Sequence, residues 1–358
     1  MSIEILESNR PPARFYRGGR RIAEFRGIGP VGEREPEDWV GSVTTVRGEA
    51  PAGLSHLAGG ERVADAIARD PDGWLGAAHV AAYGPDPMLL VKLLDAGERL
   101  PVHAHPGRAF AAEHLGLAHG KTEAWCILTP GTVHLGLVRD LAERELAGML
   151  EGQDAAEMLG AMHRLEVGPS DVVHVPAGVL HAIGEGILLV ELQEPEDVSI
   201  LVEWAGFAID GPALGHLGLG FDRALGAIET RARTADEIAA LVHRAGSAGP
   251  LLPAEADPFF RVERVTVDGR AELSPGLAVV VVLDGEVALA AAGSEPEVVA
   301  GSVAAGSEPE VAAGSAVAGS EHRVGRGTTA LVPHRAGPVR VSGRGELLVC
   351  RPPSPSAG

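Results

Sequence analysis

The chain has 358 residues, enough for two ordinary domains, and a net charge of −19. No basic stripe interrupts this acidity, which argues against a nucleic-acid partner and favours an acidic, solvated surface. Two cysteines, Cys126 and Cys350, are too few for a disulfide scaffold. The N-terminus lacks a signal-peptide pattern, and apolar runs such as 277–283 are too short to span a membrane. We therefore expect a cytoplasmic protein; its oligomeric state stays open.

The first half of the chain predicts a helical portion followed by short strands. Residues 54–83 favour helix, and from Met88 the apolar runs have strand length. Expected strands are 88–94, 100–105, 124–128, 132–138, 171–175 and 187–193. Helical spacing interrupts them at 141–164 and returns at 211–246, where Thr234 and Glu237 form a capping-box pattern.

Strands resume between Pro258 and Pro352. The expected strands are 259–267, 277–283, 286–290, 330–333, 339–341 and 346–350. Together with the earlier strands they predict a mainly β protein with helical inserts, in which the second set forms a smaller β-barrel or sandwich.

A 13-residue repeat interrupts this second set of strands. Gly-Ser-Glu-Pro-Glu-Val at 293–298 recurs at 306–311, with a degenerate copy at 319–324. The low complexity favours an expanded hairpin loop at about 291–323 over a dedicated binding segment.

Three histidines and one glutamate have the order of a metal site. His103 and His105 alternate on one expected strand, so both side chains point to the same face. Glu123 opens an apolar strand, where a carboxylate is costly unless it is paired or metal-bound. His181 follows the Pro-Ala-Gly turn at 176–178. Each residue alone has an ordinary explanation, but the set suits Zn²⁺, and also Fe, Mn or Ni.

Only two of the 30 basic residues are lysines, Lys92 and Lys121. In a chain that otherwise uses arginine, a lysine that remains is expected to be needed as a compact charge that can lose its proton. Chance retention is the alternative.

The region from Lys92 to Trp204 resembles the class I mannose-6-phosphate isomerases. The matching motifs are 91–95, 105–106, 120–125, 176–182 and 191–193. The resemblance covers about the first 200 residues well and the rest in outline. It implies two cupin-type barrels plus a helical portion, and one zinc in the first cupin, held by His105, Glu123 and His181. The family usually has Gln where this chain has His103.

The implied division is an N-terminal metal-binding cupin at 1–210, a helical connecting segment at 211–257 and a degenerate cupin at 258–358. We expect the second cupin to be structural, because His322 and His334 are isolated there.

The resemblance also implies an activity, the interconversion of mannose 6-phosphate and fructose 6-phosphate through an enediol. Lys121 and Glu191 are the candidates for proton transfer or binding of substrate hydroxyls, and Lys92 for substrate binding. The family carries an active-site arginine near Leu201, whereas this chain has no basic residue between Val190 and Asp210. Arg108 is a candidate to supply the missing positive charge. The alternative is that Arg108 is a surface residue with no role in the site.

Three functions therefore remain open. They are a mannose-6-phosphate isomerase, an isomerase or epimerase of another or unphosphorylated sugar, and a non-catalytic sugar-binding cupin. A metal-dependent oxygenase is a weaker fourth, because it leaves the lysine motifs unexplained.

Overall fold

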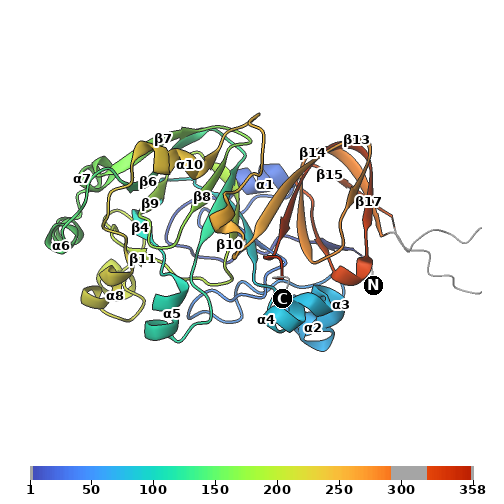
Figure 1. Ribbon diagram of the computed structural model, residues 1–358, viewed down its shortest axis with the longest axis horizontal. Helices are drawn as coiled ribbons and strands as arrows, with labels where there is room; N and C mark the ends of the chain where they lie inside the picture. Colours follow the sequence, from blue (N-terminus) through green and yellow to red (C-terminus); the bar gives the residue numbers. More distant parts are fainter. Residues whose placement is uncertain (1–2, 292–320, 356–358) are drawn as a thin grey trace, which may run out of the picture.

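The computed structural model describes residues 3–291 and 321–355, and within them three antiparallel sheets dominate (Figure 1). The central sheet contains, in spatial order, β12 (Val242–His243), β8 (Val172–Val175), β5 (Glu123–Ile127), β10 (Leu188–Gln193), β3 (Leu90–Asp95) and β2 (Glu37–Val40). The flanking sheet contains β11 (Ile200–Leu201), β4 (His103–Ala104), β9 (His181–Ile183), β6 (Gly131–Leu137) and β7 (Met162–Val167). The C-terminal sheet contains β1 (Glu4–Leu6), β16 (Thr329–Val332), β14 (Ala278–Ala291), β17 (Val339–Arg351) and β13 (Arg261–Leu273), with β15 (His322–Gly325) beside β14.

Short helices cover the ends and outer faces of these sheets. They are α1 (Arg20–Arg26), α2 (Val63–Arg69), α3 (Pro71–Leu75), α4 (Ala77–Tyr83), α5 (Arg108–Leu115), α6 (Glu143–Gly152), α7 (Ala155–Gly160), α8 (Gly211–Leu214), α9 (Phe221–Ala224) and α10 (Ala235–Ala240). Three 3₁₀ turns are η1 (Leu225–Ala227), η2 (Ala254–Ala256) and η3 (His334–Ala336). In Figure 1, α2–α4 lie beside the C-terminal sheet and α6 and α7 lie at the opposite end of the molecule.

The central sheet is buried on both faces, which explains its nearly continuous apolar strands. Trp125 and Ile127 of β5 pack toward the flanking sheet, against residues such as Leu135 and Ile183. The alternate residues of the same strand, such as Cys126, pack in a second core shared with the C-terminal sheet. Because neither face meets water, the strands lose the apolar–polar alternation of a half-exposed sheet.

The predicted fold class is confirmed: the chain is mainly β with helical inserts. The described sheets face one another without closing into a barrel. The domain limits at 210 and 258 stay predictions. One feature crosses them, because β1 at the start of the chain pairs with β16, with Glu4 opposite Leu331.

Several predicted element limits are wrong. The expected strand 100–105 is only the short β4, because Pro101 and Pro106 on either side lack the N–H that a ladder needs. The expected helix 141–164 ends at Gly160, and β7 begins at Met162. The expected strands 277–283 and 286–290 are one bent strand, β14, with a register shift between Val282 and Asp284. Likewise β17 joins 339–341 to 346–350. Most of the predicted repeat loop lies outside the described residues.

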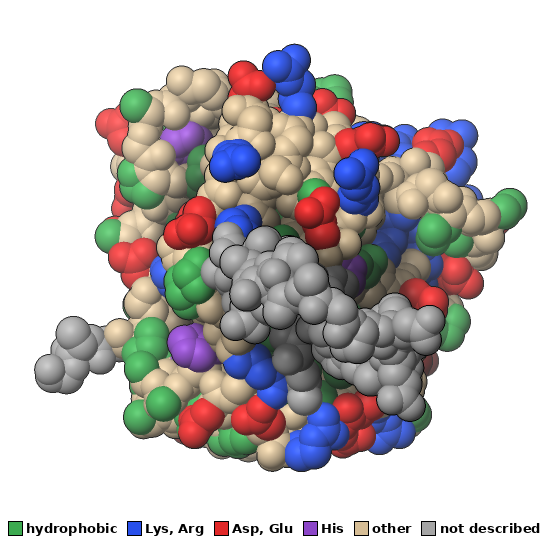
Figure 2. All heavy atoms as spheres, turned by 90° about the vertical axis from the view of Figure 1, so that its right-hand side faces the viewer, with side chains coloured by type: hydrophobic (Ala, Val, Ile, Leu, Met, Phe, Trp, Pro, Cys, Tyr) green, Lys and Arg blue, Asp and Glu red, His purple; other side chains and the backbone are tan. Residues whose placement is uncertain are grey.

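None of the described helices is long and apolar enough to cross a membrane. On the face shown in Figure 2, acidic and basic side chains are interspersed wherever the described atoms are visible. This mixture agrees with the absence of a basic stripe in the sequence.

Replacing Phe260 by alanine is expected to lower the free energy of unfolding by about 3–5 kcal/mol. The ring is fully buried in the core between the central and C-terminal sheets, so its loss leaves a cavity there. Thermal and urea unfolding measure the effect. Leu214→Ala is the control, because Leu214 is 61% exposed and should change stability by less than about 0.5 kcal/mol. Equal effects of the two substitutions would contradict the assignment of Phe260 to a continuous core.

Candidate metal centre

The flanking sheet brings three histidines together. His103 on β4 lies directly opposite His181 on β9 in the antiparallel register, and His105 is the first residue after β4. All three are buried, and one potential ligand atom from each lies within 4.8 Å of the others. The structure therefore brings these three side chains together.

A backbone carbonyl orients each imidazole. Nδ1 of His103 lies 2.8 Å from the Pro101 carbonyl oxygen, and Nδ1 of His181 lies 2.8 Å from that of Val179. Nδ1 of His105 lies 2.8 Å from the carbonyl oxygen of Val198. Because a carbonyl only accepts hydrogen bonds, each Nδ1 carries the proton and each Nε2 keeps its lone pair. This is how metal-binding histidines are usually held. The lone pair of His105 faces Nζ of Lys121, 3.2 Å away.

The charge state of the group also suits a cation. Burial, with the nearby Lys121 charge, lowers the pKa of His105 to about 3, and burial lowers the pKa of His103 and His181 as well. All three imidazoles are thus neutral near pH 7. Nε2 of His181 is buried and has no hydrogen-bond partner, which is costly in a protein interior. A metal ion at this point would satisfy it, so the residues fit a metal.

Glu123 faces the histidines from the central sheet. One carboxylate oxygen lies 3.1 Å from Nε2 of His105, and the other lies 3.5 Å from Nε2 of His181. Trp125 donates its indole N–H to Glu123 at 2.9 Å and fixes the carboxylate's orientation. Burial alone would raise the pKa of Glu123, but Lys121 and His105 lower it well below its usual range. The carboxylate is therefore ionised and adjacent to the imidazoles of His105 and His181.

Lys121, Lys92 and Glu191 extend the group along the inner face of the central sheet. Glu191 on β10 lies opposite Lys92 on β3, with Nζ of Lys92 4.0 Å from its Oε1. Nζ of Lys121 lies 3.0 Å from Oε2 of Glu123 and 3.4 Å from Oε1 of Glu191. The structure thus joins both lysines of the chain to the histidine group.

Glu191 differs from Glu123 in its ionisation. Burial, opposed by the Lys121 ammonium, raises the pKa of Glu191 to about 7. Its Oε1 is buried without a hydrogen-bond partner. A carboxyl group with a pKa near neutrality can both take up and release a proton, which is the property of a general acid–base group.

The same pocket contains residues that the sequence analysis did not select. They are Arg14, Phe15 and Tyr16 from the segment before α1, Glu37 from β2, and Asp197 and Ser199 from the loop after β10. The only signal for Glu37 was its position beside the apolar strand Trp39–Val40; nothing in the sequence marked Arg14. The cavity between these residues has a volume of about 30 Å³, which is room for an ion or a water molecule but less than a sugar needs.

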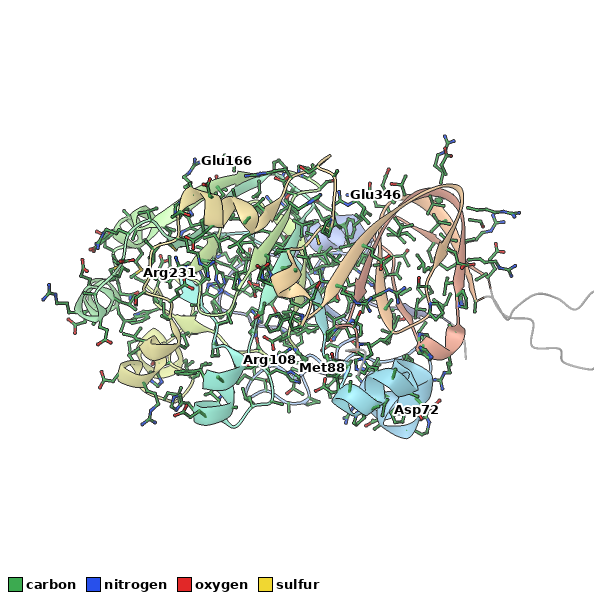
Figure 3. The ribbon with its side chains drawn as sticks, viewed as in Figure 1. Asp72, Met88, Arg108, Glu166, Arg231 and Glu346 are labelled. Carbon is green, nitrogen blue, oxygen red and sulfur yellow. The ribbon has the colours of Figure 1, made fainter. Side chains whose placement is uncertain are left out.

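Arg108 and Leu201 do not line this pocket. Arg108 begins α5 (Figure 3), pairs with the buried Glu194, and lies with its guanidinium carbon 4.5 Å from the centre of the Phe259 ring. It borders a different cavity, between α10 and η2. Leu201 is buried on β11, where the antiparallel register places it opposite His103. The structure therefore does not bring Arg108 to the histidines.

Comparison with known proteins gives consistent similarities. No protein-family model matches the chain. It is 38% identical over 114 residues to mannose-6-phosphate isomerase ManA of Bacillus subtilis, which is 31% of this chain and 35% of that protein. It is 35% identical over 116 residues to mannose-6-phosphate isomerase of Streptococcus mutans, 32% of this chain and 35% of that protein. The matched segments thus span about a third of the length of these relatives.

Structural similarity covers the whole chain. The crystal structure of mannose 6-phosphate isomerase from Bacillus subtilis superposes with a TM-score of 0.69 and 20% sequence identity, over 98% of this chain and all of that one. At this level of identity the match establishes a shared fold, including the part of the chain that the sequence matches leave out.

Proposed function

We propose that this chain, whose sequence and fold similarities support its assignment to the mannose-6-phosphate isomerase family, is a metal-dependent aldose–ketose isomerase. Its substrates in this proposal are mannose 6-phosphate and fructose 6-phosphate. The observation that carries the proposal is the acid–base carboxyl of Glu191, linked through Lys121 to a buried set of neutral histidines.

In the proposal His103, His105, Glu123 and His181 hold one zinc ion. Three imidazoles and a carboxylate match the ligand preferences of zinc, although other divalent metals accept the same set. When bound, the ion would polarise the substrate carbonyl and favour the charge of the enediolate. The Nδ1 contacts of the histidines hold the ligand set in place before the substrate arrives.

Glu191 would move the carbon-bound proton. It takes the proton from C2 of the open-chain aldose and returns it to C1 of the enediol, which yields the ketose once the hydroxyl proton at O2 is lost and O1 is protonated. Lys121, between Glu123 and Glu191, is placed to donate to the oxygens that change charge. Lys92 contacts Glu191 and Glu37 and is proposed to position them and a substrate hydroxyl.

Arg108 stays a prediction as a substrate-binding residue. Its pairing with Glu194 and its distance from the pocket lining give no contact with the reacting carbons. The absence of a basic residue between Val190 and Asp210 also favours a second candidate, an isomerase of an unphosphorylated or different sugar.

Isomerisation of mannose 6-phosphate and fructose 6-phosphate by zinc-loaded protein tests the proposal. We expect interconversion that a chelator stops and added zinc restores. Free mannose and fructose, assayed in parallel, separate the two candidate functions. No turnover of either pair by protein with a full complement of metal would refute isomerisation of these sugars and leave a different sugar substrate or a sugar-binding protein.

The proposal also retains a cytoplasmic location, in keeping with a phosphorylated metabolite as substrate. It includes no nucleic-acid or membrane partner.

A further inference from the structure

Arg14 is the most accessible cation of the metal pocket. Its side chain is 12% exposed, compared with 8% for Lys121 and 2% for Lys92. It comes from the segment before α1, far in sequence from the motifs that supply the histidines and lysines. The proton transfers described above do not use it, so its presence in the pocket lining needs a separate explanation.

The Arg14 guanidinium has donors to spare. Nε donates to Oε1 of Glu37 at 3.3 Å, and Nη1 and Nη2 donate to the two oxygens of Asp197 at 3.4 and 3.2 Å. A guanidinium has five N–H groups. One N–H on each Nη therefore has no partner in the described part of the chain. Two N–H groups on neighbouring nitrogens suit the oxygens of a phosphate.

The three hydrogen bonds that Arg14 makes to Glu37 and Asp197 are also long. Charge-assisted N–H···O bonds are typically about 2.7–2.9 Å long, and all three contacts of Arg14 are longer than this. Asp197, its main partner, is 13% exposed and lies with Arg14 at the more accessible side of the pocket. The guanidinium can therefore shift toward an incoming anion while keeping a carboxylate beside it.

The charge of the pocket favours an anion once metal is bound. Three cations and four carboxylates line it: Arg14, Lys92, Lys121, Glu37, Glu123, Glu191 and Asp197. A divalent ion at the histidines would leave the pocket one unit positive. Within this field Arg14 is the cation nearest to solvent by its exposure.

We infer that Arg14 is a specificity-determining residue that binds the phosphate of the sugar phosphate. It supplies from the N-terminal segment the cation that the stretch between Val190 and Asp210 lacks. The inference rests on the proposed function for the identity of the substrate, but its phosphate-binding part can be measured without turnover.

Two variants and one control test it: Arg14→Gln, Arg14→Lys and Arg21→Gln. Arg21 also pairs with a buried carboxylate, Asp95 at 3.0 Å, but does not line the pocket. Arg14→Gln should raise KM for mannose 6-phosphate by about 10- to 100-fold with a smaller change in kcat. Arg14→Lys should recover part of this loss, since it keeps the charge but not the fork of donors. Arg21→Gln should leave KM unchanged.

Calorimetric titration of the metal-loaded proteins with inorganic phosphate gives a readout independent of activity. Arg14→Gln should weaken phosphate binding by a similar factor. Unchanged KM and phosphate affinity in a folded Arg14→Gln protein would overturn the inference. If Arg14→Gln does not fold, the same comparison is made with Arg14→Lys.

The titration also separates failure of this inference from failure of the proposed function. If the wild type turns over no sugar phosphate, the proposed function is wrong. In that case phosphate binding that depends on Arg14 still supports the inference, and a wild type that binds no phosphate refutes it. If the wild type is active and the Arg14 variants match it, the function stands and the inference fails.

Discussion

Glu191→Gln is expected to lower kcat by about 10²–10⁴-fold without reducing the metal content. Glutamine keeps the shape of the side chain but cannot take up the carbon-bound proton. The substitution leaves His103, His105 and His181 untouched, so metal analysis should still find a full equivalent. Glu203→Gln is the matched control, because Glu203 is an equally buried carboxylate that pairs with Arg99 and does not line the pocket.

The pH dependence gives this prediction a second signature. Only the deprotonated form of Glu191 can act as a base, and its pKa is raised to about 7 by burial against the opposing charge of Lys121. The deprotonated fraction of Glu191 therefore falls as the pH drops below 7, and kcat/KM should fall with it. Bound metal, as a nearby positive charge, would move this acid-side decline to lower pH. Any activity left in Glu191→Gln should not show this decline of kcat/KM at low pH. An unaltered pH profile in the variant would assign the base to another residue.

His181→Ala is expected to lose both metal and activity, the latter by at least about 100-fold. The substitution removes the imidazole whose Nε2 has no other partner, and with it one of the three orienting contacts to backbone carbonyls. Elemental analysis measures the metal, and isomerase assays with and without added zinc measure the activity.

Thermal unfolding separates metal loss from misfolding in this experiment. A ligand that binds only the folded state raises the unfolding temperature, so zinc should stabilise the wild type and a chelator should reverse the effect. His181→Ala should not respond to zinc. His114→Ala on α5 serves as the control, since His114 lies outside the histidine group and should keep the wild-type response. A His181→Ala protein that still binds a full equivalent of zinc would contradict the assigned ligand.

The proximity of the central site residues could be predicted because the information is local. Alternation along a strand places His103 and His105 on one face, and the turn at 176–178 delivers His181 to the neighbouring strand. The scarcity of lysine pointed to Lys92 and Lys121, which the structure joins through Glu191. In each case the signal lay within a few residues of the side chain concerned.

Contacts between distant segments left no such signal. Arg14 pairs with Asp197, which lies 183 residues further along the sequence. Nothing in the sequence near either residue indicates the other as its partner. The bend in β14 is similar: Asp284-Gly285 has the composition of a turn, but the long partner β17 holds the strand together through it. Gly285 has a φ of 77° there and no room for a side chain, because a Cβ would lie 2.2 Å from the Arg344 carbonyl oxygen. Such features depend on the partner strand, so the sequence of one segment could not predict them.

The pairing of β1 with β16 bears on the order in which the molecule can be completed during synthesis. β1 leaves the ribosome before the other described elements, but its partner β16 is among the last of them to emerge. Until then the segment that follows β1, which contributes Arg14 and Tyr16 to the pocket, has no sheet to hold its start. Nascent or prematurely terminated chains would therefore contain the histidines and their orienting carbonyls, the last of which belongs to Val198, while the start of the segment with Arg14 and Tyr16 lacks its sheet partner.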